Sequence, residues 1–251
     1  MKKSIGEEDI GALENYRKEL NEWLELASML KNKPTSSRED AVFHTEAMSS
    51  YLDMVRASNR ERITRTAPII CEYAKVFTSL IDIGGGHGAF SAEILRLKPD
   101  AHATITTFPL QLIMRGKVRP IELKERVTLI PGDARNMEIK DQYDIALVND
   151  LLHCFGTEDK MDILRRSVQA IAPGGKIFVG KFFMDEDDPK NPSNNHTFSM
   201  KMILNTRDGY LESIQEVKRN LAELNCTDIQ VYELEHHMPS VIVAAKRGGE
   251  Y

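Results

Sequence analysis

The sequence predicts an α/β fold with a doubly wound, Rossmann-like sheet of seven strands, an antiparallel C-terminal hairpin and N-terminal helices. Three observations support this prediction. From residue 79 onward, short apolar runs alternate with helical patterns, which is typical of parallel strands joined by crossover helices. A cluster of glycines directly follows the first apolar run. The last two apolar runs are joined by a link too short for a parallel crossover, so we expect them to pair antiparallel at a sheet edge.

The N-terminal region is expected to be helical. Over residues 7–31, apolar side chains that include the only tryptophan, Trp23, recur at three- and four-residue intervals and form one stripe. This stripe fits packing against the main domain and packing against a partner chain equally well, and the second alternative makes the chain a homodimer. Further helices are expected at about residues 39–58 and 61–76, the latter kinked near Pro68.

The rest of the chain has the pattern of one domain. We expect a helical appendage over residues 1–38 and the main domain over residues 39–251. The seven strands are expected at residues 79–83, 103–106, 127–130, 145–149, 176–180, 229–232 and 241–245. The clearest helices are expected at residues 88–97, 111–115, 159–171 and 211–224.

Composition argues against several classes of protein. The net charge of −5 gives no general attraction to nucleic acid or to an anionic membrane, so neither is expected as a partner. No apolar run approaches the ~18 residues of a membrane span, and we expect no secretory signal. The three cysteines are widely spaced and odd in number, which favours a reducing cytoplasm over a disulfide framework.

The glycine-rich turn lies between a buried strand and a helix. It contains Gly84, Gly85 and Gly86. Glycines at such a junction permit a tight turn and let a ligand approach the backbone. Asp82, at the end of the strand, is expected to accept hydrogen bonds from the loop or to reach a cationic group of a ligand. S-adenosylmethionine (SAM) carries an ammonium and a sulfonium, so an acid here suits SAM better than it suits a pyrophosphate.

A nicotinamide cofactor is the alternative for this turn. The pattern Gly84-x-Gly86-x-x-Ala89 satisfies the dinucleotide fingerprint, which is weak support by itself. A dinucleotide site requires an acid about 20 residues further on, at the end of the second strand. This sequence has Thr107 and Phe108 there, which disfavours an NAD(P)-dependent oxidoreductase.

The motifs resemble a known family when they are taken together. The segment Leu-Ile-Asp-Ile-Gly-Gly-Gly-His-Gly-Ala, residues 80–89, closely resembles motif I of the class I small-molecule O-methyltransferases typified by caffeate and acetylserotonin O-methyltransferases. Further matches follow in order at residues 131–133, 144–153 and 172–177. The resemblance spans about residues 43–247 and implies the SAM methyltransferase form of the predicted sheet. The helical dimerisation domain of that family would be absent here or reduced to the first predicted helix.

The resemblance implies SAM as the cofactor. The Gly132-Asp133 motif resembles the one whose carboxylate contacts adenine, and Thr107 takes the place of the usual ribose-binding acid. Thr107 offers only a neutral hydrogen bond. The residues assigned to SAM are Asp82, Gly84, Gly85, Gly86, Thr107, Phe108, Gly132, Asp133, Ala134 and Asn149.

The resemblance assigns catalysis to His153, which is expected to end the fourth strand. In the family, a histidine here is the general base that removes the proton from a substrate hydroxyl while the oxygen attacks the SAM methyl group. Imidazole suits this role because its pKa lies near neutrality; a structural histidine is the alternative. Cys154 and Lys181 stand where the family has acids. Asp208, where the family often carries a histidine-orienting glutamate, is the second catalytic candidate.

The acceptor is expected to be a small molecule. Substrate contacts are assigned to Met48, His196, Met200 and Asn205, with ordinary packing as an equal alternative. No metal is expected, because the adjacent His236 and His237 lack the spacing of a zinc site. A Cys154–His153 thiol hydrolase is disfavoured because neighbouring strand residues face opposite ways.

The sequence therefore predicts a SAM-dependent methyltransferase acting on an aromatic or polyketide-like hydroxyl. C- or N-methylation, an NAD(P)-dependent oxidoreductase and an inactive SAM-binding partner protein are the alternatives.

Overall fold

The computed structural model describes Arg17 and residues 59–107, 121–184, 195–196, 198–200, 202, 206, 208–234 and 240–248. Several predictions fall outside these residues. They are the helices expected at residues 7–31, 39–58 and 111–115, together with the domain boundary at residue 38. Dimerisation through the N-terminal helices therefore stays a prediction.

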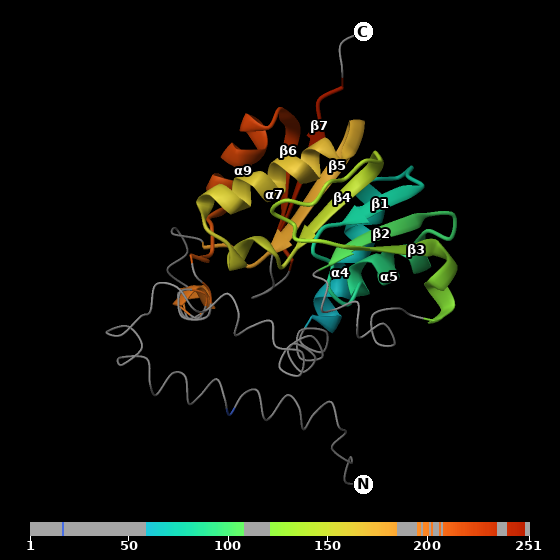
Figure 1. The fold of residues 1–251 in the computed structure, drawn as a ribbon, viewed down its shortest axis with the longest axis horizontal. Coiled ribbons are helices and arrows are strands. Elements are labelled where there is room, and N and C mark those ends of the chain that lie inside the picture. Colours follow the sequence, from blue (N-terminus) through green and yellow to red (C-terminus); the bar gives the residue numbers. More distant parts are fainter. Residues whose placement is uncertain are drawn as a thin grey trace.

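A seven-stranded sheet forms the centre of the molecule (Figure 1). Its strands are β1 (Ser79–Asp82), β2 (His102–Thr107), β3 (Val127–Pro131), β4 (Tyr143–Asn149), β5 (Ile171–Lys181), β6 (Cys226–Tyr232) and β7 (Ser240–Lys246). Their order is β3-β2-β1-β4-β5-β7-β6. Strands β1 to β5 pair in parallel, whereas β7 pairs antiparallel with both β5 and β6. The doubly wound sheet with an antiparallel C-terminal hairpin is confirmed.

The strand bounds differ most from prediction at β5. This strand begins at Ile171, five residues earlier than expected, because Tyr143 pairs with Ile171 before the register shifts to the pair Ile145–Lys176. The Ala-Pro-Gly-Gly sequence that separates these two pairings has the composition of a turn. The sequence pattern therefore did not reveal that residues 171–181 form one strand with a bulge.

Helices cover both faces of the sheet. They are α4 (Arg60–Tyr73), α5 (Ala89–Leu97), α7 (Thr157–Gln169) and α9 (Ile214–Glu223). Helices α4 and α5 pack on one face, and α7 and α9 pack on the other (Figure 1). Helix α4 contains Pro68 and ends at Tyr73, three residues before the predicted end. No described helix combines the length and the apolar character that crossing a lipid bilayer requires.

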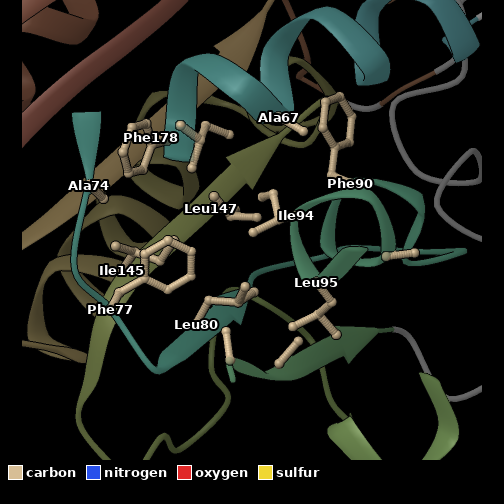
Figure 2. Packing of buried hydrophobic residues seen from close by; sticks show 14 of the residues in the cluster. Ala67, Ala74, Phe77, Leu80, Phe90, Ile94, Leu95, Ile145, Leu147 and Phe178 are labelled. Atoms are coloured by element: carbon tan, nitrogen blue, oxygen red, sulfur yellow. The ribbon is translucent and has the colours of Figure 1, made fainter. Parts of the chain in front are cut away.

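Two hydrophobic cores explain why the strands are apolar runs rather than alternating patterns. Successive residues of one strand enter opposite cores: Leu80 and Leu147 pack under α4 and α5, whereas Ile81 and Val148 pack under α7 and α9. Both faces of each central strand are therefore buried, as is usual for a parallel sheet. Figure 2 shows the first core, where Leu80 and Leu147 point toward Ile94 of α5. Each such buried side chain contributes about 1.5–3 kcal/mol.

The register brings the carboxyl ends of four strands to one edge. Asp82 at the end of β1 pairs with Ile105 of β2 and with Leu147 of β4, and Asn149 at the end of β4 pairs with Gly180 of β5. The strand order reverses between β1 and β4, since β2 and β3 lie on one side and β5 on the other. Ligands of open α/β sheets bind at such a switch point.

The outer strand β6 is irregular. Its pairing with β7 shifts between Thr227 and Gln230, and Asp228 has a positive φ of 52°. Tyr73 of α4 donates a hydrogen bond from its hydroxyl group to Asp228 Oδ2 at 2.9 Å. The irregularity is therefore held in place by a contact from a helix.

The carboxyl end of α5 is closed by the Arg126 guanidinium. Its nitrogens donate hydrogen bonds to the backbone oxygens of Leu95, Lys98 and Ala101 at 3.1–3.2 Å. Backbone oxygens in the last turn of a helix have no partner within the helix, so an external cation satisfies them and complements the helix dipole.

Replacing Arg126 with Met is expected to lower the free energy of unfolding by about 1.5–3 kcal/mol, because hydrogen bonds from a charged donor to these oxygens are lost. Urea denaturation measures the change. Arg165→Met is the matched control: Arg165 pairs with exposed Asp162 within α7, and its loss should cost less than about 0.5 kcal/mol. Equal effects of the two substitutions would contradict the capping role.

Candidate active site at the carboxyl edge of the sheet

The glycine turn is locked to the strand ends. The Gly84 amide donates to Thr106 Oγ1 and the Gly85 amide donates to the Thr106 backbone oxygen, both at 3.0 Å. Gly84 and Gly86 have positive φ angles of 66° and 53°, which disfavour any other residue. A Cβ atom on Gly85 would lie 2.5 Å from the Asp82 carboxyl carbon. The turn therefore lies directly over Asp82 and requires glycine for this contact.

Asp82 is a buried acid with one unpartnered oxygen. Its side chain is 1% exposed, and Oδ2 accepts a hydrogen bond from Ser91 Oγ of α5 at 2.7 Å. Burial raises the pKa of Asp82 to about 6, and the hydrogen bonds from Ser91 oppose this rise. Oδ1 has no hydrogen-bond partner in the part of the chain that the structure describes. The side-chain hydrogen bond thus comes from helix α5, and Oδ1 stays available to a ligand.

Two neighbouring strand ends also present buried polar atoms without partners. Among the described residues, Thr107 Oγ1 at the end of β2 has no hydrogen-bond partner, and neither side-chain amide atom of Asn149 at the end of β4 has one. Both residues are buried. Buried polar groups are almost always hydrogen bonded, so a cluster of exceptions calls for an explanation. These three predicted residues, Asp82, Thr107 and Asn149, end strands that lie side by side, which fits a missing polar ligand.

Asp133 follows β3 and is held by Arg135. The Arg135 side chain donates to both carboxylate oxygens, from Nε at 3.1 and 3.0 Å and from Nη2 at 2.6 Å. Although burial raises the pKa of Asp133, the hydrogen bonds and charge of Arg135 bring it below its usual value. The Gly132 amide donates to the Thr107 backbone oxygen at 3.0 Å, so this predicted motif adjoins the end of β2. The Ala134 side chain packs in the core, which leaves only its backbone for a ligand.

An ion pair that the sequence did not reveal anchors α4 to the site. Asp150, directly after β4, has a φ of 49° and accepts hydrogen bonds from both terminal nitrogens of Arg62 and from Asn59 Nδ2. Arg62 is 5% exposed, and burial lowers its pKa to about 10. Its guanidinium carbon also lies 5.1 Å from the ring centroid of Phe90. No sequence pattern connects residues so far apart, so this pair required the structure.

His153 does not end the fourth strand, contrary to the prediction. Strand β4 stops at Asn149, and His153 lies in the short 3₁₀-helix η2 (Leu152–Cys154). The positive φ of Asp150 redirects the chain immediately after the strand. His153 is 3% exposed, its Nδ1 has no hydrogen-bond partner among the described residues, and the ring of Phe198 meets the imidazole edge-on at 5.1 Å.

The same geometry corrects the argument about Cys154. His153 and Cys154 are neighbours on a 3₁₀ turn rather than on a strand, so the alternation of strand faces does not separate them. Burial instead raises the pKa of the Cys154 thiol to about 11. A thiol nucleophile reacts as the thiolate, which this environment disfavours.

The surroundings of His153 are cationic. Burial lowers its pKa to about 3, and the charges of Lys181, Lys160 and Arg62 contribute to the shift in that order. This low pKa favours the neutral imidazole near neutral pH. Within the described part of the chain, no carboxylate hydrogen bonds to Nδ1.

Two buried lysines share one carboxylate next to this histidine. Lys160 Nζ lies 3.0 Å from Glu212 Oε2, and Lys181 Nζ pairs with the same oxygen. The side chains of both lysines are 1% exposed and that of Glu212 is fully buried. Lys181 was noted in the sequence, but Lys160 and Glu212 were missed. One signal was present: Lys160 precedes Ile163 and Leu164 by three and four residues, on the apolar face of α7.

Three other predicted site residues lie in the described part of the chain. Asp208 is exposed and its Cβ packs near Gly156; in the described part of the chain His153 Nδ1 has no hydrogen-bond partner, so a histidine-orienting role of Asp208 stays a prediction. His196 and Met200 are exposed, Met200 at 42%. The other predictions, which lie outside the described residues, are Met48, Phe108, Asn205, His236 and His237. Within the described part of the chain, no three His, Cys, Asp or Glu residues group as a metal would require.

Comparison with known proteins identifies the family. The model of the O-methyltransferase domain matches residues 33–223. The chain belongs to this family. Its relatives include the 3-amino-4-hydroxybenzoate 4-O-methyltransferase of Streptomyces cremeus, 30% identical over 63% of this chain and 44% of the relative. The tetracenomycin polyketide synthesis 8-O-methyl transferase of Streptomyces glaucescens is 26% identical over 61% of this chain and 45% of the relative. The matched part is thus less than half of each of these two relatives.

Solved structures share the fold of this O-methyltransferase domain. An O-methyltransferase family protein from Burkholderia thailandensis superposes with a TM-score of 0.82 at 20% identity, covering 96% of this chain and 72% of the other. Human N-acetylserotonin methyltransferase, solved in complex with SAM, gives 0.75 at 20% identity, covering 90% of this chain and 66% of the other. The predicted fold class and the family resemblance are both confirmed.

Replacing Asp82 with Asn is expected to stabilise the fold at neutral pH. The folded pKa is raised, so the unfolded chain loses this proton first as pH rises. The buried Asp82 carboxylate therefore does not destabilise the fold below the usual pKa of 3.8, and it destabilises the fold fully above about pH 6. The full effect is about 3 kcal/mol at most. Urea unfolding at about pH 5 and about pH 7.5 measures the effect, and the advantage of the variant should be larger at the higher pH.

Ser91→Ala is the opposing control for this experiment. It removes the hydrogen bond that stabilises the Asp82 carboxylate, so it should destabilise the protein more at about pH 7.5 than at about pH 5. Equal free energies of unfolding for Asp82→Asn and the wild type at both pH values would contradict the raised pKa of Asp82.

Proposed function

We propose that this protein is a SAM-dependent O-methyltransferase that acts on a hydroxyl group of a small aromatic or polyketide-like acceptor, with His153 as the base beside the reacting oxygen. One observation carries the proposal: the buried and unpartnered polar atoms of Asp82, Thr107 and Asn149 end three adjacent strands next to the glycine turn. A polar cofactor would satisfy all of them at once.

The donors and acceptors at this edge suit SAM. Asp82 Oδ1 would accept from its ammonium group, and Thr107 Oγ1 would hydrogen bond to a ribose hydroxyl. The Asp133 carboxylate would contact the adenine. The glycine turn keeps side chains away from the ligand. When bound, SAM supplies an electrophilic methyl group. Phe108 stays a prediction for this site.

The relatives support the choice of acceptor. Their names describe transfer to oxygen on an aminohydroxybenzoate and on a polyketide, and a neighbour with the same fold binds SAM. Because the matched region is less than half of these relatives, the activity of the whole protein is part of the proposal.

His153 would face the acceptor hydroxyl in its neutral form. A neutral imidazole accepts a hydrogen bond and can take a proton as the oxygen attacks. The ring of Phe198 lies against His153 at 5.1 Å and against Phe182 at 5.6 Å. These rings provide an apolar, planar surface on which an aromatic acceptor can stack while water is excluded.

Replacing Thr107 with Val is expected to weaken SAM binding by about 2- to 10-fold, the value of one neutral hydrogen bond. Calorimetry with SAM measures this, and calorimetry with NAD on the unmodified protein tests the alternative cofactor. NAD binding without SAM binding would refute the proposed function.

Thr66→Val is the matched control. Thr66 Oγ1 in α4 is likewise buried and unpartnered, so both substitutions should raise the free energy of unfolding slightly. Only Thr107→Val should change the affinity for SAM. A loss of affinity in both variants would point to a general effect on the fold.

Replacing His153 with Ala is expected to lower kcat by about 100-fold with little change in the affinity for SAM, because the acceptor oxygen loses its proton acceptor. Methyl transfer from labelled SAM to a hydroxybenzoate panel provides the assay. Unchanged turnover would mean that the imidazole takes no part and that positioning alone carries the reaction.

A further inference from the structure

We propose that Arg62 is a positioning residue for methyl transfer, because its pair with Asp150 fixes the imidazole of His153 relative to the cofactor held at the glycine turn. The inference rests on the proposed function and adds a residue to it. Arg62 lies in the first turn of α4, and no motif of the sequence assigns it a role.

The contact between Arg62 and Asp150 fixes an orientation as well as a charge. Arg62 Nη1 donates to Asp150 Oδ1 at 2.7 Å, and Nη2 donates to Oδ2. Two parallel hydrogen bonds from a planar guanidinium hold a carboxylate in one orientation, which a single ammonium group does not. The side chains of Arg62 and Asp150 are only 5% and 20% exposed, so solvent screens the pair little. The Asp150 carboxylate is therefore fixed relative to α4.

Asp150 is the point at which the chain leaves the sheet toward His153. Its amide donates to the Gly180 backbone oxygen at 2.9 Å, so its backbone is still fixed to β5. Its φ of 49° lies in the left-handed region, which costs an aspartate free energy. Strained backbone of this kind persists only where the surrounding contacts determine it. The side-chain contacts from α4 supply that restraint.

The segment after Asp150 contacts the glycine turn and then carries the proposed base. Leu151 lies against the turn, since a Cβ atom on Gly84 would be 2.6 Å from Leu151 Cδ1. The Cys154 amide donates to the Leu151 backbone oxygen at 3.1 Å and closes the 3₁₀ turn that contains His153. The direction in which the chain leaves Asp150 therefore sets where His153 lies relative to the glycine turn.

Arg62 also contacts the helix that follows the glycine turn. Its guanidinium carbon lies 5.1 Å from the ring centroid of Phe90, in the first turn of α5. Phe90 points from α5 toward α4 (Figure 2). One side chain therefore joins the helix that begins at the glycine turn to the segment that leads to His153. Methyl transfer depends on such alignment, since a misplacement of about 1 Å can cost about 100-fold in rate.

The charge of Arg62 and its position have opposite effects on the reaction. Burial lowers the pKa of His153 to about 3, and the charges of Lys181, Lys160 and Arg62 add to this effect in that order. Removing the Arg62 charge would therefore raise the pKa of the imidazole and make it a stronger base. Loss of alignment would instead slow the reaction. The sign of the change in kcat separates the two effects.

The first test combines Arg62→Met with His153→Ala in the full chain. Arg62→Met keeps a long side chain over Phe90 but loses both hydrogen bonds to Asp150, so it should lower kcat by about 10-fold or more while SAM affinity stays within about threefold. In a chain that already carries His153→Ala, the same substitution should lower kcat by less than about twofold further, because the residue that it positions is gone. An unchanged or higher kcat for Arg62→Met alone, or an equal loss in both backgrounds, would overturn the inference.

A second variant assigns the effect to the pair. Asn tolerates a positive φ, so Asp150→Asn removes the charge and keeps the backbone turn. Combined with Arg62→Met, it leaves neither partner as an unpaired buried charge. The double variant should have a kcat within about twofold of that of Arg62→Met, because both substitutions break the same contact. A further loss as large as the first would mean that the two residues act separately, against the inference.

Arg126→Met is the matched control for the loss of a structural arginine. Arg126 donates to backbone oxygens at the carboxyl end of α5, away from the site. Its substitution should destabilise the fold, but kcat below the unfolding temperature should stay within about twofold of the wild-type value. A fall in kcat as large as that of Arg62→Met would show that the loss follows stability rather than position.

Hydrogen exchange tests the position of the segment without an acceptor. The amides of Asp150, Cys154 and Phe155 are hydrogen bonded to backbone oxygens. In Arg62→Met, peptides that cover residues 150–155 should exchange at least about 10-fold faster, whereas peptides from α9 should not change. Unchanged exchange over residues 150–155, or normal turnover, would overturn the inference alone. Absence of methyl transfer by the wild-type chain despite SAM binding would overturn the proposed function with it.

Discussion

The parallel pairing of β1 with both β2 and β4 is the constraint on which the rest of the molecule depends. Because the strand order reverses there, the chain leaves these strands toward opposite faces, and the carboxyl ends stay open between the two helical layers. The glycine turn, the buried Asp82 and the short helix that carries His153 all occupy this opening. Each of them is tolerable only because two apolar cores hold the central strands firmly on both faces.

Stability and function conflict at this edge. Asp82, Thr107 and Asn149 bury polar atoms that the described chain leaves unsatisfied, and Lys160, Lys181 and Glu212 bury three ionisable side chains together. Such features cost free energy in the absence of a ligand. They are concentrated where the cofactor and the acceptor would meet, whereas the far ends of the strands are satisfied by ordinary pairs such as Asp144 with Ser79.

Local patterns were sufficient to predict the sheet. Continuous apolar runs marked the parallel strands, the glycines marked the first turn, and the short final link required an antiparallel hairpin. Prediction was weaker wherever contacts are long range. His153 was expected to end the fourth strand because of its place in the family motif, but β4 ends at Asn149, where the strand was predicted to end, and the positive φ of Asp150 turns the chain before His153. Glu212 and Arg62 act across the fold, and no spacing in the sequence links them to His153 or Asp150. Asp208 was chosen by its position in a motif and is exposed, whereas Glu212, four residues later, is buried and had no signal in the sequence.

The irregular outer strand β6 has a consequence for association. An exposed sheet edge is a template on which another chain can add a strand, and a regular β6 would continue the hydrogen-bond ladder outward. The shifted pairing near Asp228 and its contact with Tyr73 break the spacing of the outward-facing amide and carbonyl groups. An irregular edge of this kind disfavours the in-register addition of a strand from a second copy of the sheet.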